Sequence, residues 1–219
     1  MKPLILFQGD SITDVSRNRD NDHYAGHGYP TLVKARLGYD APGRYEFLNR
    51  GVSGNRVVDL YARIKMDIIN LKPDYLSILI GVNDVWHEVS RQNGVNAAKF
   101  RRVYDMLLCE VREALPGIRL LILEPFVLPG TATMDTEEAP DRLTTFQREV
   151  ALRAEAAREV AAVHGACFVP LQRRFDQAAW GMDPAYWLID GVHPSAMGHE
   201  LIARAWMEGF NSLCAGEEM

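Results

Sequence analysis

The chain has 219 residues, of which 47% are hydrophobic and 24% charged, and this composition excludes a disordered, collagen-like or coiled-coil protein. The length suits one substantial core, so we expect a single domain over residues 1–219. The formal net charge is −5 and the basic residues are dispersed, which leaves no electrostatic footprint for a nucleic-acid partner.

The cysteine content and the absence of long apolar runs bear on where the protein resides. An odd number of cysteines at wide, irregular spacing fits neither a disulfide framework nor a zinc knuckle; they are Cys109, Cys167 and Cys214. The apolar run at residues 4–7 is too short for a signal-peptide core, and no run approaches the roughly 18 apolar residues of a membrane span. We therefore expect a cytoplasmic protein without a membrane partner.

Short apolar runs alternate along the chain with segments of helical period, a pattern typical of parallel strands covered by helices. The predicted strands are residues 4–7, 45–48, 75–80, 119–123 and 166–169. The predicted helices are residues 57–68, 100–111, 143–157 and 202–209. Residues 13–28 and 127–141 show no period and are expected to form loops. The sequence thus predicts an α/β fold with an open, doubly wound parallel sheet of about five strands.

Four polar, glycine-bearing clusters lie where such a sheet binds ligands, beyond the carboxyl ends of its strands or before the last helix. They are Gly9-Asp10-Ser11, Gly51-Val52-Ser53-Gly54-Asn55, Gly81-Val82-Asn83-Asp84 and Asp190-Gly191-Val192-His193-Pro194. Together they offer a hydroxyl, backbone amides, a carboxamide and an Asp/His pair. These are the components of an acyl-transfer site.

The first and last clusters supply a nucleophile and its base. A serine hydroxyl attacks poorly until a base removes its proton, so Ser11 needs an imidazole within hydrogen-bond reach. His193 is the best candidate because both positions map to the same sheet edge. Asp190 lies three residues earlier and can bind the other ring nitrogen across a turn, which would fix the tautomer.

The middle clusters supply donors for the oxyanion that forms during acyl transfer. The backbone at Gly54 can approach a ligand closely because glycine has no side chain, and Asn83 can donate from its carboxamide. With the backbone amide of Ser11 they make three candidate donors from three successive loops. The alternatives are that Ser11 is only a helix N-cap and that Asn83 only stabilises a loop.

These blocks resemble the four motifs of the SGNH, or GDSL-type, esterases and acylhydrolases. The resemblance rests on Gly9-Asp10-Ser11-Ile12-Thr13-Asp14, Gly54, Gly81-Val82-Asn83-Asp84 and Asp190-Gly191-Val192-His193-Pro194, which occur in order over most of the chain. It implies a flavodoxin-like, three-layer α/β/α fold, the SGNH hydrolase fold. It also implies a triad of Ser11, His193 and Asp190 and an oxyanion hole of Ser11, Gly54 and Asn83.

Further motifs resemble the branch of that family that includes bacterial acetylxylan esterases. They are Asn49-Arg50-Gly51-Val52-Ser53-Gly54-Asn55, Lys72-Pro73-Asp74, Gly81-Val82-Asn83-Asp84-Val85-Trp86 and Gly198-His199. This resemblance implies deacetylation of small acetylated sugars.

Three residues beside the blocks are candidates for substrate binding. Trp86 and Trp187 adjoin the third and fourth blocks, where flat aromatic faces suit sugar rings or acyl groups, and core packing is their alternative role. Arg56 follows the Gly54 loop and either binds substrate oxygens or pairs with an acid.

Two other features invite a different chemistry. Ser53 is a rival serine, but its surroundings lack the second spaced glycine of a nucleophile elbow. His23 and His27, with Asp20 and Asp22 nearby, suggest a zinc site, yet the segment is loop-like. We expect no metal and no organic cofactor.

The sequence predicts a serine esterase that hydrolyses short-chain acetyl esters of carbohydrates, such as acetylated xylo-oligosaccharides, through an acyl-enzyme on Ser11. The expected partner is a small-molecule ester, and a homo-oligomer is left open. One alternative is a thioesterase or lysophospholipase of the same family. Another is a non-enzymatic binding domain on the same fold, against which the complete set of site residues argues.

Overall fold

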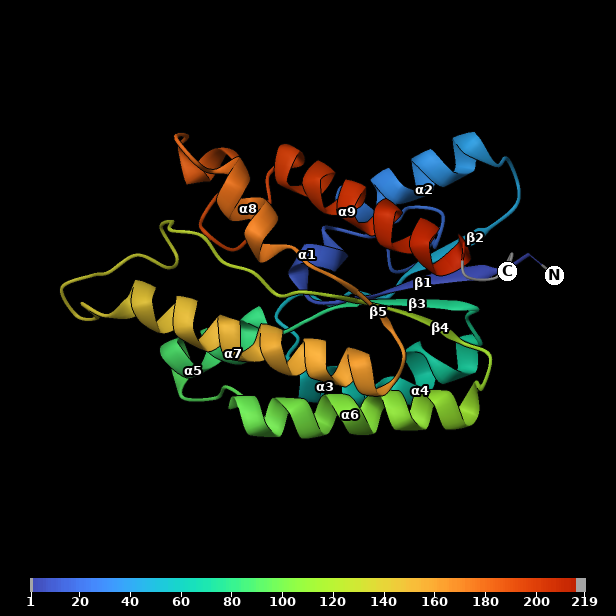
Figure 1. Ribbon diagram of the computed structural model, residues 1–219, viewed down its shortest axis with the longest axis horizontal. Helices are drawn as coiled ribbons and strands as arrows, with labels where there is room; N and C mark the ends of the chain where they lie inside the picture. The colour runs from blue at the N-terminus through green and yellow to red at the C-terminus, as the bar shows by residue number, and fades with distance from the viewer. Residues whose placement is uncertain (1, 216–219) are drawn as a thin grey trace.

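The computed structural model describes residues 2–215 and has a single five-stranded sheet at its centre (Figure 1). All neighbouring strands are parallel, in the order β2-β1-β3-β4-β5. The strands are β1 (Leu4–Gly9), β2 (Glu46–Asn49), β3 (Tyr75–Leu79), β4 (Arg119–Leu123) and β5 (Cys167–Val169). The predicted α/β fold with five parallel strands is confirmed.

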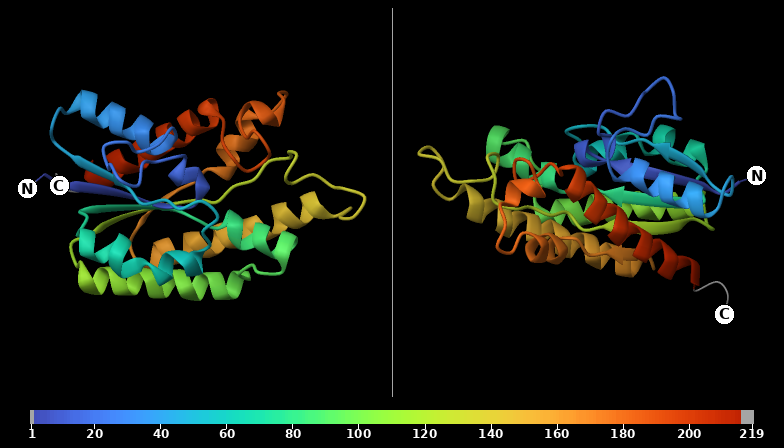
Figure 2. Two further views of the ribbon diagram at one scale, coloured as in Figure 1. Left: turned by 180° about the vertical axis from the view of Figure 1, so that it is seen from behind. Right: turned by 90° about the horizontal axis from the view of Figure 1, so that it is seen from above.

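Helices cover both faces of the sheet and make a three-layer sandwich (Figures 1 and 2). One layer contains α2 (Tyr29–Asp40), α8 (Gln172–Ala178) and α9 (Ala196–Ala215). The other contains α3 (Val57–Ala62), α4 (Ile64–Asp67), α5 (Val82–Arg91), α6 (Ala97–Ala114) and α7 (Arg142–Val163). The short helix α1 (Ser11–Asp14) and the 3-10 turns η1 (Ile69–Leu71) and η2 (Pro184–Tyr186) complete the described elements. No helix within residues 2–215 is both long and apolar enough to cross a membrane.

The core lies on both faces of the sheet, because the central strands carry apolar side chains on both faces. All five residues of β3 are buried, and the only polar one among them, Ser77, accepts a hydrogen bond of 2.9 Å from the Trp206 indole N–H of α9. Trp206 is fully buried and stacks on Phe210 with ring centroids 4.9 Å apart. These contacts fix α9 on the sheet and so help to place the segment that precedes it.

The predicted helix over residues 57–68 is interrupted, although its apolar stripe is correct. Val57, Leu60, Ile64 and Ile68 are all buried, but the chain forms α3, α4 and η1 in place of one helix. The interruption is at Arg63, which has φ −112° and ψ 12° and both ends α3 and begins α4. The apolar side chains therefore keep a helical spacing over the whole segment, whereas the backbone hydrogen bonds of the helix are interrupted at Arg63.

Candidate active site

Ser11 lies directly beyond the carboxyl end of β1, at the start of α1. The N-cap of α1 is Asp10, whose side chain accepts the Ile12 N–H at 3.0 Å, so the interpretation of Ser11 as the cap is wrong. A side chain at Gly9 would overlap the Leu79 carbonyl of β3. The chain can turn this tightly because glycine has none. The turn presents the half-buried Ser11 hydroxyl to the segment before α9.

The Ser11 hydroxyl meets His193 across 182 residues of sequence, with 2.9 Å between Ser11 Oγ and His193 Nε2. His193 Nδ1 lies 2.7 Å from Asp190 Oδ2. The other oxygen of Asp190 accepts the backbone N–H groups of Val192 at 2.9 Å and His193 at 2.8 Å. The turn thus holds the carboxylate rigidly. The carboxylate favours the tautomer with the proton on Nδ1, which leaves Nε2 free to accept a hydrogen bond from Ser11.

The charges of the Asp190–His193 pair reinforce this arrangement. Burial acts to raise the pKa of Asp190, but the hydrogen bonds from His193 and Val192 outweigh it and lower that pKa to about 2. The hydrogen bond to Asp190 raises the pKa of His193 above its usual value, against the effect of burial. Asp190 is therefore an anion, and its hydrogen bond favours the protonated form of the His193 imidazole.

The three candidate oxyanion donors follow three adjacent strands: Gly54 follows β2, Ser11 follows β1 and Asn83 follows β3. Asn83 is buried in the first turn of α5, and its Nδ2 has no hydrogen-bond partner among residues 2–215. A buried amide without a partner is costly, so this geometry favours a donor waiting for a ligand over a loop-stabilising side chain. Gly54 has φ +79°, which favours glycine, and open space in front of its Cα.

Two buried carboxyl groups, those of Asp10 and Asp84, directly adjoin Ser11 and Asn83 in the sequence. Burial raises the pKa of Asp10 to about 7, while the Ile12 N–H and the nearby His193 act to lower it. Burial also raises the pKa of Asp84, whose two oxygens each lie 3.2 Å from the Val57 N–H at the start of α3. Asp84 thereby ties α5 to α3, a role for which its place in the third block gave no signal.

The structure separates the three predicted substrate-binding residues. Trp86 of α5 is half-buried, and its ring centroid lies 5.7 Å from that of His193. Trp187 instead lines a groove of about 540 Å³ between α8 and α9. Arg56 makes two hydrogen bonds to the Asp59 carboxylate, at 2.9 and 3.0 Å, and others to Asn93, so its guanidinium takes the acid-pairing role.

The rival sites suggested by the sequence do not assemble. Ser53 is exposed, and its backbone N–H donates to Asp14 at 3.0 Å, with no bond to an imidazole within residues 2–215. His23 and His27 do not belong to a group of three metal-ligating side chains. Among residues 2–215 only one such group occurs, on α6 and directly after α7.

Two supports of the site were not predicted. Residues 128–132 form a clamp over the Asp190 turn, in which the Leu128 N–H donates to the Gly191 carbonyl and the Ala132 N–H to the Asp190 carbonyl, both at 2.9 Å. A side chain at Gly130 would overlap the Asp190 and Gly191 backbone, so the clamp requires glycine there. Pro129 and Gly130 mark a loop in the sequence, but nothing there indicates that the loop contacts the Asp190 turn.

The second support is the buried Asn49 at the end of β2. Its Nδ2 donates to the carbonyls of Thr13 at 2.6 Å and Ala25 at 2.8 Å, and its Oδ1 accepts the Gly51 N–H at 2.9 Å. One side chain therefore connects the segment after β1, which contains Ser11, to the loop after β2, which contains Gly54. Both residues are candidate oxyanion donors.

Comparison with known proteins identifies the family of the chain. Residues 7–201 match the model of the GDSL-like lipase/acylhydrolase family. The chain is 32% identical to the acetylxylan esterase of Geobacillus stearothermophilus over 212 residues, which is 93% of this chain and 91% of that enzyme. A crystal structure of that esterase has a TM-score of 0.82 at 30% identity and covers 94% of this chain and 93% of its own. A GDSL-like lipase structure from Parabacteroides merdae has a TM-score of 0.87 at 34% identity over 95% of both chains. The chain belongs to the GDSL-like lipase/acylhydrolase family and is a carboxylic ester hydrolase.

Proposed function

We propose that the protein is a serine esterase that removes acetyl groups from small carbohydrates, such as acetylated xylo-oligosaccharides, and that Ser11 carries the acyl group. The observation that carries this proposal is the chain of hydrogen bonds from Ser11 through His193 to Asp190. The Geobacillus relative supports the acetyl group and the xylan-derived sugar.

In the first half of the reaction Ser11 Oγ attacks the ester carbonyl while His193 Nε2 takes the hydroxyl proton. The carbonyl oxygen becomes an oxyanion that the amides of Ser11 and Gly54 and the Asn83 carboxamide stabilise. When the intermediate collapses, the bond to the sugar oxygen breaks and His193 returns the proton to that oxygen. The free sugar leaves and the acetyl group stays on Ser11.

In the second half a water molecule attacks the acetyl-Ser11 carbonyl, and His193 removes a proton from that water. The same donors hold the second oxyanion. Its collapse breaks the bond to Ser11 Oγ, which takes its proton back from His193, and acetate is released. Variants of the Geobacillus enzyme described as catalytic mutants replace a serine or an aspartate by alanine, which supports these two residue types in the relative's chemistry.

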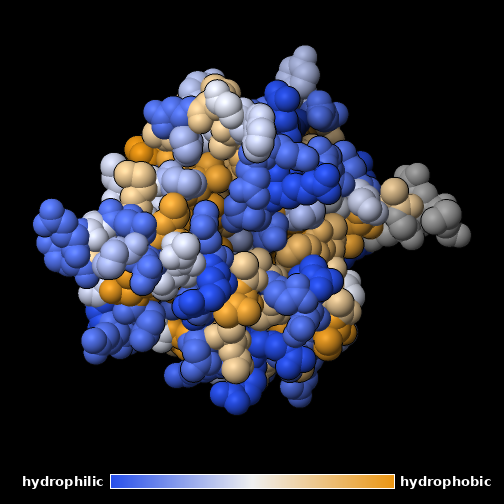
Figure 3. Space-filling view, turned by 60° about the vertical axis from the view of Figure 1, so that its left-hand side comes forward, coloured by the Kyte–Doolittle hydropathy of each residue, from blue (hydrophilic) through white to orange (hydrophobic). Residues whose placement is uncertain are grey.

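The surroundings of the site support a small, polar substrate over a fatty one. The loop tip at residues 134–140 is mostly exposed and carries Asp135, Glu137 and Glu138. On the face shown in Figure 3, apolar residues form separate small groups between hydrophilic ones. Trp86 beside His193 supplies an aromatic surface for a sugar ring.

The free thiols support a reducing compartment as the place of action. All three cysteines are free, and none is placed to form a disulfide in the structure. We therefore propose a cytoplasmic esterase that acts on small acetylated sugars.

A chain-length series tests the substrate. We expect kcat/KM on nitrophenyl esters to be highest for C2 and to decline beyond about C4, and acetylated xylo-oligosaccharides to be better substrates than simple alkyl acetates. In a groove that accepts a fatty chain each added methylene is worth about 0.8 kcal/mol, so a lipase would gain steadily with length. A maximum at C8 or longer would favour a lysophospholipase or thioesterase.

Labelling with an organophosphonate followed by mass spectrometry tests the nucleophile. We expect one adduct, on Ser11, and no labelling of the Ser11→Ala variant. An adduct on Ser53 with Ser11 unmodified would overturn the proposed mechanism.

A further inference from the structure

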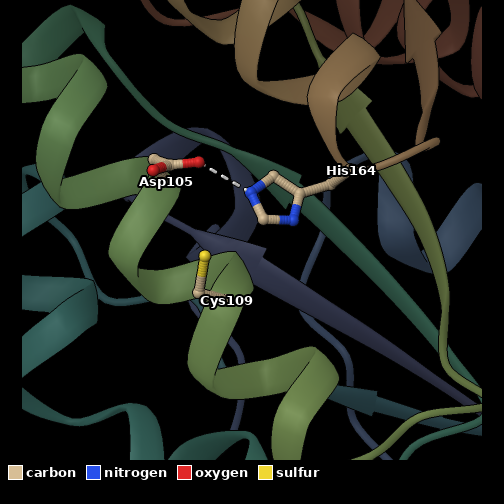
Figure 4. Close-up of side chains that lie close together, drawn as sticks. All are labelled: Asp105, Cys109 and His164. Carbon is tan, nitrogen blue, oxygen red and sulfur yellow. Dashed lines mark hydrogen bonds and ion pairs between the residues drawn. The ribbon is translucent and has the colours of Figure 1, made fainter.

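Three side chains of different chemistry gather on the outer surface of the α6–α7 layer (Figure 4). Asp105 and Cys109 are four residues apart on α6, which places them on one face of that helix. His164 follows α7 as its C-cap residue and reaches back to them. His164 Nε2 lies 2.8 Å from Asp105 Oδ1, and the three ligand atoms lie within 4.8 Å of one another.

Imidazole, thiolate and carboxylate are the protein ligands that Zn²⁺ prefers. A tetrahedral zinc ion with bonds of about 2.0–2.3 Å sets its ligand atoms roughly 3.3–3.8 Å apart. To reach this spacing, the distance between Asp105 Oδ1 and His164 Nε2 must lengthen slightly from 2.8 Å, and Cys109 Sγ must move closer to both atoms. Cys109 is exposed, and Figure 4 shows its sulfur directed toward the imidazole, so a side-chain rotation suffices.

The backbone of His164 is anchored on both sides, and its ring is held against Asp105. The His164 side chain is only 8% exposed, its backbone N–H donates to the Val160 carbonyl at 3.1 Å, and its own carbonyl accepts a bond from Arg112 of α6. Backbone anchoring of this kind lowers the entropy lost on binding a metal.

The local charge favours a cation. The carboxylates of Asp105 and Glu113 both lie close enough to Cys109 to act on its thiol electrostatically. A bound divalent ion would stabilise both a thiolate at Cys109 and these carboxylates.

The cluster is remote from the hydrolytic site. Phe146, which contacts Trp86, lies near the start of α7, and His164 lies eighteen residues later, or about 27 Å along the helix. A metal here has no access to the ester, so its effect is on the structure: it would join α6 to the turn between α7 and β5.

We propose that Asp105, Cys109 and His164 form a binding site for one Zn²⁺ ion that links α6 to the end of α7. Co²⁺ is the spectroscopic probe, because it takes zinc sites and gives a thiolate-to-metal charge-transfer band when a cysteine binds it. We expect the untagged chain to show this band with one Co²⁺ bound per chain, and Zn²⁺ to abolish the band by displacing the probe. Saturating Zn²⁺ should raise the Tm by a few degrees.

Variants decide which residues bind. Cys109→Ser should lose the band while keeping full esterase activity, which shows that it folds, and Asp105→Asn and His164→Gln should each weaken Co²⁺ binding at least about tenfold. Cys167→Ser and Cys214→Ser are the matched controls and should retain the band. The absence of a band in the parent chain, its persistence in Cys109→Ser, or unchanged affinity in both other variants would overturn the site.

Discussion

In the proposed mechanism His193 accepts the Ser11 proton only while its Nε2 is unprotonated, so we expect activity to depend on the charge of this ring. The hydrogen bond to Asp190 raises the pKa of His193, and Asp10 acts in the same direction, whereas burial opposes them. The remaining neighbours are His199, which is itself held neutral, and the uncharged Trp86. We expect kcat/KM to rise with pH through a single group that titrates above the ordinary histidine value of about 6.5.

The Asp190→Asn variant checks the cause of that shift. Without the carboxylate the limb of the pH profile should move to lower pH, and kcat should fall on the order of 10⁴-fold because the ring loses its tautomeric control. A pH profile of kcat/KM for both proteins measures the two effects. A profile that does not move in the variant would show that Asp190 does not set the pKa of His193.

Asn83 should act chiefly on the transition state, because the buried Nδ2 has no partner within hydrogen-bond geometry among residues 2–215. We expect Asn83→Ala to lower kcat by about 10²–10³-fold with little change in KM, as for other single oxyanion donors. Steady-state kinetics on nitrophenyl acetate give both constants, and thermal unfolding shows that the variant is folded. Near-normal kcat in the folded variant would remove Asn83 from the oxyanion hole.

Asp10 should make the wild type less stable as pH rises. Its pKa is raised by burial to about 7 from an ordinary 3.8, so between these values the folded state keeps a proton that the unfolded state releases. The stabilising contribution is complete below about pH 4 and is lost as pH rises through about 7. Between pH 5 and 8 the free energy of unfolding of the Asp10→Asn variant should therefore rise relative to that of the wild type, by about 3 kcal/mol or less.

Urea unfolding of both proteins at pH 5 and pH 8 measures this difference. Asparagine keeps an oxygen for the Ile12 N–H, so the cap of α1 is a matched feature. The same difference in free energy of unfolding at both pH values would show that Asp10 is not held protonated.

At the scale of elements, α2 and α9 are joined by a histidine whose titration acts in the opposite sense. His199 of α9 is buried, and its Nδ1 accepts the Tyr29 N–H of α2 at 3.2 Å. Burial lowers the pKa of His199 to about 4, with a smaller contribution from His193. This stabilising contribution is present above about pH 6.5 and is lost as pH falls through about 4.

Replacing His199 by Gln keeps an acceptor for Tyr29 but removes the titration. We expect the variant to lose less free energy of unfolding than the wild type between pH 7 and 4.5, by about 3 kcal/mol or less. Denaturant unfolding at those pH values is the measurement. Parallel losses in the two proteins would contradict a neutral, buried His199.

The clamp at residues 128–132 predicts the effect of a single methyl group. A side chain at Gly130 overlaps the Asp190 and Gly191 backbone, so Gly130→Ala must displace the Asp190 turn. We expect kcat to fall at least about 10²-fold, because small misplacements of catalytic groups are that costly. Gly117→Ala is the matched control, since a Cβ there meets nothing within 4 Å, and it should keep full activity. Equal kcat in the two variants would show that the clamp does not position Asp190.

The strands were easier to predict than the helices. All five strand cores are apolar runs, and each predicted strand overlaps an observed one. Helices α1, α2, α5 and α8 have no counterpart among the predicted helices, and the end of α1 lies in the segment predicted to be a loop over residues 13–28. The first turn of α5 contains Asn83 and Asp84, polar residues that a periodicity argument assigns to a loop, and their burial depends on contacts with other elements. The spacing of apolar residues cannot predict a helix in which buried positions are occupied by polar residues.

At the scale of the whole molecule, the parallel sheet explains why much of the site could be predicted. Strand order places the ends of β2, β1 and β3 side by side, so three short motifs converge once the fold class is known. The contact between Ser11 and His193 follows from the same topology. The roles of Arg56 and Trp187 could not be predicted, because they depend on which long side chains happen to face each other across loops.

The loop between β4 and α7 divides into two parts with different freedom to change. Residues 128–132 are fixed by the Asp190 turn, whereas the tip at residues 134–140 is mostly exposed and projects past the start of α7 (Figure 1). Substitutions or insertions in the tip leave the backbone bonds of the clamp intact. Evolution, or a laboratory library confined to the tip, can therefore vary this part of the loop without rebuilding the turn that holds Asp190 and His193.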